Sequence, residues 1–162
     1  MYSLILLLPL LSFLTTNCLG RFIGIFGCCL LATASIFLSF SFSVFAFYEV
    51  ALSDSTMLIH LANWLNVELF TASWSFLFDP IAVVMLLVVT VVSSLVHLYS
   101  TEYMSADPHL GRFMGYLSLF TFFMLVLVTA DNFLVMFFGW EGIGLASYLL
   151  ISFWFNRIQA GK

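Results

Sequence analysis

Long stretches without a single charged residue constrain this chain more than any other feature. Residues 1–20, 22–48, 80–101 and 113–130 contain no Asp, Glu, Lys or Arg, and each stretch is mostly apolar. A helix of about 20 apolar residues spans the roughly 30 Å hydrocarbon layer of a bilayer. We therefore predict an all-α polytopic membrane protein.

The overall composition supports this class of protein. The 162 residues are 64% hydrophobic and 7% charged, with a mean hydropathy of +1.17, which is more apolar surface than a soluble core needs. Only four residues are basic, so the chain has no basic patch with which to bind nucleic acid. Cys18, Cys28 and Cys29 form no CxxC motif, and no histidine lies at metal-ligand spacing. We expect free thiols and no metal site.

Charged residues and turn signals divide the chain into five predicted transmembrane helices. Asp79 suits the N-cap of the third helix, and Pro80 suits its first position. The N-terminal segment lacks the basic region of a secretory signal and the Arg-rich pattern of a transit peptide, so we expect a retained helix. The predicted helices cover residues 2–20, 22–48, 80–103, 113–130 and 132–156.

The segment between the second and third predicted helices has a different pattern. Residues 70–78 alternate, with Phe70, Trp74, Phe76 and Phe78 on one side, and such alternation is typical of a strand. Residues 57–63 are a suitable partner, with a turn near residues 66–68. We predict an extramembrane β-hairpin over about 56–78. Because an isolated hairpin is marginally stable in water, we expect protein to cover this aromatic side.

Glu141 lies in the middle of the last predicted helix. Nine uncharged residues separate it from Asp131, and fifteen separate it from Arg157. At 1.5 Å per residue it lies roughly 13 Å along a helix that begins near residue 132, close to the bilayer midplane. An acidic side chain there costs about 2.5–3.5 kcal/mol on insertion scales, which makes it a functional hypothesis by default. The alternative is that Glu141 is protonated and only forms a hydrogen bond with a neighbouring helix.

Small residues surround this carboxylate. Gly142 and Ala146 form a small-xxx-small pair, and Gly139 lies one turn earlier. Glycine destabilises a helix by up to about 1 kcal/mol. The cluster therefore indicates that another backbone packs closely against this helix.

The basic residues predict the orientation in the membrane. Arg21 lies between the first two helices, Arg112 between the third and fourth, and Arg157 and Lys162 after the fifth. With five spans all four lie on one side, which the positive-inside rule makes the inner side. The N-terminus, the hairpin and the turn at Asp131 then lie on the outer side.

Several of these stretches resemble a known family. Residues 138–151 contain the Gly-Trp-Glu-Gly sequence at 139–142, and residues 76–79, 94–100 and 128–133 also match. They resemble the antiporter-like chain 5 family of NADH:ubiquinone oxidoreductase, respiratory complex I, and are most similar to its mitochondrial versions. The resemblance extends over residues 1–162. It implies the mitochondrial inner membrane, with the N-terminus on the intermembrane-space side and the C-terminus on the matrix side.

The resemblance also implies a function. Members of this family pump protons, while electron transfer occurs in other subunits, where FMN, the iron–sulfur clusters and ubiquinone are expected. No cofactor is expected in this chain. The family's helix-5 glutamate, matched here by Glu141, pairs with a lysine on a later helix. The hairpin resembles an element that interlocks with its neighbours on the outer face.

This chain ends after the fifth predicted helix, whereas family members continue through two inverted repeats. The lysine partner of Glu141 is therefore absent. We expect a second polypeptide to supply the remaining helices of the subunit, beside the other membrane-arm subunits and lipid. A split gene is favoured over a truncated product, because the chain ends on a polar segment, residues 156–162.

Other functions fit parts of the sequence. One alternative is the large subunit of a multisubunit cation/proton antiporter, and another is a non-catalytic membrane scaffold. His97, in the last third of the third helix, is a candidate for a proton path, with a packed or interfacial histidine as the alternative. Asp131 is predicted to be an N-cap, with a role in proton transfer as the less favoured alternative.

Overall fold

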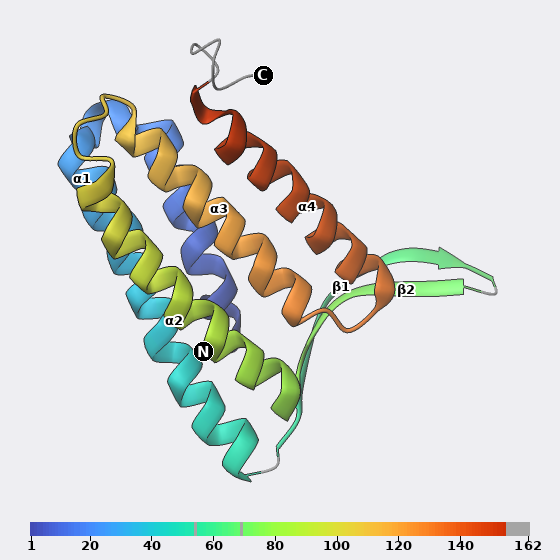
Figure 1. The fold of residues 1–162 in the computed structure, drawn as a ribbon. Coiled ribbons are helices and arrows are strands. Elements are labelled where there is room, and N and C mark those ends of the chain that lie inside the picture. Colours follow the sequence, from blue (N-terminus) through green and yellow to red (C-terminus); the bar gives the residue numbers. More distant parts are fainter. Residues whose placement is uncertain (54, 69, 155–162) are drawn as a thin grey trace.

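The first helix folds back on itself at a single glycine. The computed structural model describes residues 1–53, 55–68 and 70–154. Helix α1, Tyr2–Ser53, is interrupted at Gly24, which has φ 77° and ψ 169°. Residues with a Cβ rarely adopt this positive φ, so glycine permits the reversal. The two arms of α1 then lie side by side (Figure 1), and the Ser39 hydroxyl donates a hydrogen bond to the carbonyl of Ile5.

The break in α1 moves the predicted boundary between the first two spans from Arg21 to Gly24. Five separate helices were expected, with the first boundary at Arg21. Within the described residues the structure instead has four helices long and apolar enough to cross a membrane, the first containing both predicted N-terminal spans. The physical reason is that Arg21 is compatible with helical backbone, and the reversal occurs at the residue without a side chain.

Three further helices follow. Helix α2 is Pro80–Tyr103, α3 is Leu110–Val128 and α4 is Phe133–Ile151, continued by a 3-10 turn, η1, at Ser152–Trp154. The Asp79 side chain accepts a hydrogen bond from the Ala82 N–H at 2.7 Å, which confirms the predicted N-cap. Helix α3 begins three residues earlier than predicted. The predicted end of the last helix, near residue 156, lies outside the described residues.

The hairpin consists of two antiparallel strands, β1 at Met57–Val67 and β2 at Phe70–Phe78. Strand β1 is longer than predicted, and its pairing register shifts between His60 and Ala62 and between Asn63 and Leu65. These irregularities disrupt the simple alternation along β1, of which the sequence pattern identified residues 57–63.

The chain itself covers the aromatic side of β2 at the end near the helices. Phe78 is fully buried and its ring lies 5.0 Å from that of Tyr2. Trp74 contacts Trp64 and Phe138, with ring centroids 5.0 and 4.9 Å away. Phe70 is 54% exposed in this chain, so its covering by protein stays a prediction about a partner. The hairpin projects away from the helices at its turn (Figure 1), and the described residues do not cover that end.

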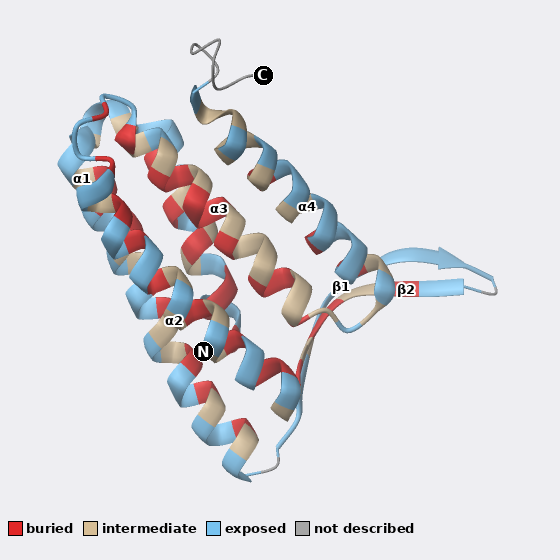
Figure 2. Ribbon diagram, viewed as in Figure 1, coloured by how far each residue is buried: buried red, intermediate tan, exposed pale blue. Residues whose placement is uncertain are grey.

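The interior consists of two apolar clusters with polar groups between them. Figure 2 shows buried residues on the facing sides of α1, α2 and α3, whereas α4 is largely exposed. The larger cluster lies at the hairpin end and includes Ile5, Phe78 and Val135. The smaller lies near the bend of α1 and includes Ala32 and Met114. Between them the buried residues include Ser12, Ser43, Thr90, Ser94, His97, Ser118 and Thr121.

Candidate functional site

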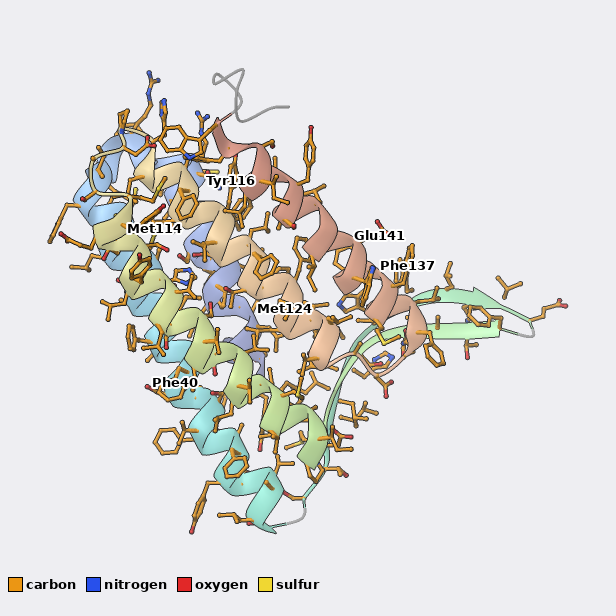
Figure 3. All side chains as sticks on the ribbon, viewed as in Figure 1. Phe40, Met114, Tyr116, Met124, Phe137 and Glu141 are labelled. Atoms are coloured by element: carbon orange, nitrogen blue, oxygen red, sulfur yellow. The ribbon has the colours of Figure 1, made fainter. Side chains whose placement is uncertain are left out.

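Helix α4 presents Glu141 on its outer side. The carboxylate is exposed, as are the neighbouring Trp140 and Phe137, at 68% and 61%. Figure 3 shows Glu141 and Phe137 on the side of α4 away from α3. Within the described residues Glu141 forms no hydrogen bond and has no basic group within 4.0 Å. An acidic group therefore stands on an otherwise apolar helix surface that this part of the chain leaves uncovered.

The glycines of α4 explain why Glu141 faces outwards. A Cβ added to Gly139 would lie 2.8 Å from the backbone nitrogen of Leu127, so α3 packs directly against this position. A Cβ on Gly142 would overlap the ring of Phe123, and Ala146 is fully buried. The predicted close packing of a second helix is confirmed. Because helical residues advance by about 100°, Glu141 lies some 200° around the helix from Gly139 and faces away from α3.

His97 occupies the opposite kind of environment. Its side chain is fully buried on α2, where Nδ1 lies 2.8 Å from the carbonyl oxygen of Ser93, one turn earlier. Its Nε2 lies 3.3 Å from the hydroxyl of Ser118 on α3. The Ser118 hydroxyl is also 3.2 Å from that of Ser12 on α1. On the other side, the Ser93 hydroxyl lies 2.6 Å from that of Thr121.

These contacts define the protonation of the neutral imidazole. A carbonyl oxygen only accepts, so Nδ1 carries the proton that it donates to Ser93. Nε2 then has a free lone pair, which accepts from the Ser118 hydroxyl. If Nε2 gains a proton, Ser118 accepts from it and directs its own proton to the Met114 carbonyl, 3.0 Å away, or to Ser12. His97 thus lies in a hydroxyl network that accommodates either protonation state. We call His97, Ser12, Ser93, Ser118 and Thr121 the His97 network.

Asp131 holds the hairpin against the turn between α3 and α4. The Ser75 hydroxyl donates to its Oδ2 at 2.7 Å. The predicted N-cap role was wrong: Asn132 caps α4, its Oδ1 accepting from the Val135 N–H at 3.0 Å. The Asn132 amide also donates to the Ser73 carbonyl at 2.6 Å. Asp131 precedes the cap, and its carboxylate is directed to β2 instead of to the first turn of α4.

The three predicted site residues are not brought together. Helix α4 packs mainly on α3, whereas His97 lies between α2, α3 and the first arm of α1. No hydrogen bond among the described residues joins the His97 network to Glu141 or Asp131. In the same part of the chain, no group of three His, Cys, Asp or Glu residues could hold a metal ion.

Sequence reasoning missed the hydroxyl partners of His97. Ser12 and Ser118 are far apart in the chain, and no motif links them. A partial signal was available, because Ser93 and His97 lie four residues apart and therefore share a helix face. Serine and threonine are also frequent in transmembrane helices with no function beyond packing, so the signal was weak.

The chain has relatives among known proteins. Residues 64–114 match the family model described as "NADH-Ubiquinone oxidoreductase (complex I), chain 5 N-terminus". All 162 residues align with chain 5 of NADH-ubiquinone oxidoreductase from Marchantia polymorpha and from Arabidopsis thaliana, each 59% identical, and with that from Mycosarcoma maydis, 56% identical. The chain spans 24% of the length of each of these relatives.

Together the apolar helices fit a multi-pass membrane protein, and these matches show that the chain is similar to the N-terminal part of an antiporter-like membrane subunit. More particularly, the chain is related over its whole length to the N-terminal quarter of chain 5 of NADH-ubiquinone oxidoreductase. Its relatives are thus named as parts of an oxidoreductase complex.

Proposed function

We propose that this chain is the N-terminal part of a proton-translocating subunit that couples NADH oxidation and ubiquinone reduction to proton pumping. The observation that carries the proposal is Glu141, a carboxylate on the exposed apolar side of α4 that has no partner among the described residues. A lone charge in hydrocarbon is strongly disfavoured, so the group must become neutral or meet a positive charge.

The environment of Glu141 determines what it can do. Desolvation favours its protonated form, and a neighbouring cation favours the ionised form. A lysine that approaches, withdraws or changes its own proton would move Glu141 between these states, as a proton relay requires. Both described arginines, Arg21 and Arg112, flank the bend of α1 and the start of α3, far along the helices from Glu141. We propose that the cation comes from another polypeptide of the assembly.

The proposed context follows from the relatives. We propose that a second polypeptide supplies the remaining helices and the lysine, and that other subunits hold FMN, the iron–sulfur clusters and ubiquinone. The chain itself performs no redox chemistry. We place it in the mitochondrial inner membrane, with the N-terminus facing the intermembrane space. The family match and the relatives named after complex I favour this function over a separate cation/proton antiporter.

The test compares Glu141→Gln with the parent in the assembled complex. Glutamine keeps the shape and loses the titration, so we expect assembly to persist and proton pumping to fall strongly. The matched control is Glu102→Gln, which removes an exposed carboxylate from the last turn of α2. Normal pumping by Glu141→Gln would leave only a packing role. An assembled structure with no basic residue within roughly 8 Å of the Glu141 carboxylate, about one Debye length, would likewise leave only a packing role.

The hydrogen bonds of the His97 network support a second proton-accepting group, His97 itself. We propose that His97 takes up and returns a proton within the membrane, with Ser118 and Ser12 as its hydrogen-bonding partners. His97→Gln keeps hydrogen-bonding groups and loses the titration, so we expect fewer protons pumped per NADH oxidised in a complex that still assembles. If His97→Gln pumps normally while His97→Leu impairs assembly, the histidine only satisfies its buried neighbours.

A further inference from the structure

Two arginines from distant parts of the sequence line one cavity at the end of the helices. The cavity, of about 240 Å³, lies between the bend of α1 and the start of α3. Arg21 and Arg112 both border it. The other polar side chains of its lining, Thr16, Asn17 and His109, come from the same two regions. The fold therefore gathers hydrogen-bond donors and positive charge in one place.

No carboxylate in the described part of the chain forms an ion pair with these arginines. Within the described residues neither has an acidic group within 4.0 Å. Asp107 is nearby in the chain, but it does not line the cavity, and its Oδ1 accepts from the His109 N–H at 2.9 Å. Two like charges beside one cavity repel each other, and an anion bound between them would offset this repulsion. Guanidinium groups bind phosphate oxygens through paired hydrogen bonds.

The start of α3 adds to the positive potential. His109 occupies the N-cap position and makes no side-chain capping hydrogen bond. The partial positive charge of an uncapped helix N-terminus favours anions, and Gly111 and Arg112 of this first turn border the cavity. This contribution supplements the two arginines.

The surroundings of the cavity point to a lipid. Three apolar side chains beside Arg21 are exposed at the bend: Phe22 at 87%, Phe26 at 82% and Ile25 at 52%. The bend terminates apolar helices long enough to span a membrane, so these side chains belong at the boundary between headgroups and acyl chains. A free phosphate ion has no apolar part that could contact these side chains. Basic pockets between transmembrane helices on the cytoplasmic or matrix side bind acidic lipid headgroups, and this is the side proposed for Arg21 and Arg112.

We propose that the cavity binds the phosphate of an anionic phospholipid, with Arg21 and Arg112 as its ion-pairing residues and Phe22 and Phe26 against the acyl chains. This inference goes beyond proton translocation and is independent of Glu141. One lipid headgroup bound to both arginines would link the bend of α1 to the start of α3 at the membrane surface.

The test is native mass spectrometry of the full 162-residue chain in detergent, titrated with phosphatidylglycerol, phosphatidylcholine or inorganic phosphate. We expect phosphatidylglycerol to bind more tightly than either of the others. Arg21→Gln or Arg112→Gln should each weaken it about fivefold, the effect of one interfacial cation, and the double variant should weaken it by more than tenfold. The controls are the two Arg→Lys variants, which keep the charge, and Glu102→Gln, outside this cavity.

Two results would rule out an anion site in this cavity. One is unchanged phosphatidylglycerol binding by the double Gln variant whose helical circular dichroism matches that of the parent. The other is equal binding of phosphatidylcholine, which would indicate general lipid coating of apolar helices. Inorganic phosphate binding as tightly as the lipid would overturn the lipid assignment and leave a simple anion site. If the double Gln variant fails to fold, the single Lys variants decide, since they should retain most of the selectivity for phosphatidylglycerol.

Discussion

Substituting Gly139 by alanine tests how closely α3 and α4 approach each other. The added Cβ would lie 2.8 Å from the backbone nitrogen of Leu127 and 2.9 Å from its Cα. Real Cβ atoms essentially never come so close, and backbone atoms cannot rotate away. The helices must therefore separate or tilt. Overpacking of this kind costs typically about 1–3 kcal/mol.

Gly144 provides a matched control on the same helix. A Cβ at that position meets nothing within 4 Å among the described residues. Both changes gain up to about 1 kcal/mol of helix propensity, so this term cancels in the comparison. Gly139→Ala should therefore be less stable than Gly144→Ala by about 1–3 kcal/mol. For a chain of this length, 2 kcal/mol corresponds to a Tm difference of about 4–8 °C.

The assay is thermal unfolding of the 162-residue chain in detergent, followed by circular dichroism. A third variant separates backbone from side-chain overlap. Gly142→Ala meets the ring of Phe123, which is a side chain, so a second change, Phe123→Leu, should restore part of its stability. Leu127→Ala should not restore Gly139→Ala to the same degree. A Gly139→Ala chain as stable as Gly144→Ala would refute the close approach of these helices.

Two further changes test the hairpin and the orientation. Ser75→Ala removes the hydroxyl that donates to Asp131, and we expect a loss of about 1 kcal/mol with increased exposure of Trp74, measured by fluorescence quenching. Unchanged quenching would show that this hydrogen bond does not hold the hairpin. Cysteines placed at His60 and His109 in a cysteine-free background should react with impermeant reagents from opposite sides of the membrane, with residue 60 outside. Labelling of both from one side would contradict the proposed topology.

Local sequence patterns were sufficient for the features that depend on neighbouring residues. Uncharged runs predicted apolar helices because hydrocarbon excludes charge, and Asp79 followed by Pro80 predicted the start of α2 because the capping bond is made within one turn. The aromatic alternation in β2 predicted a strand for the same local reason. The glycines of α4 predicted close packing without indicating which helix would approach.

The tertiary structure decided what depends on residues far apart in the chain. Only the fold showed that α1 reverses at Gly24, that Asp131 bonds Ser75 and that Asn132 is the cap. In the same way, the partners of His97 come from three segments, and the cavity of Arg21 and Arg112 from two. The sequence by itself determined the class of protein and the candidate carboxylate, because burial of apolar surface and the rarity of membrane charges are local properties. A uniformly apolar helix can pack inwards with any of several faces. The pairing of its polar groups therefore depends on how the helices pack.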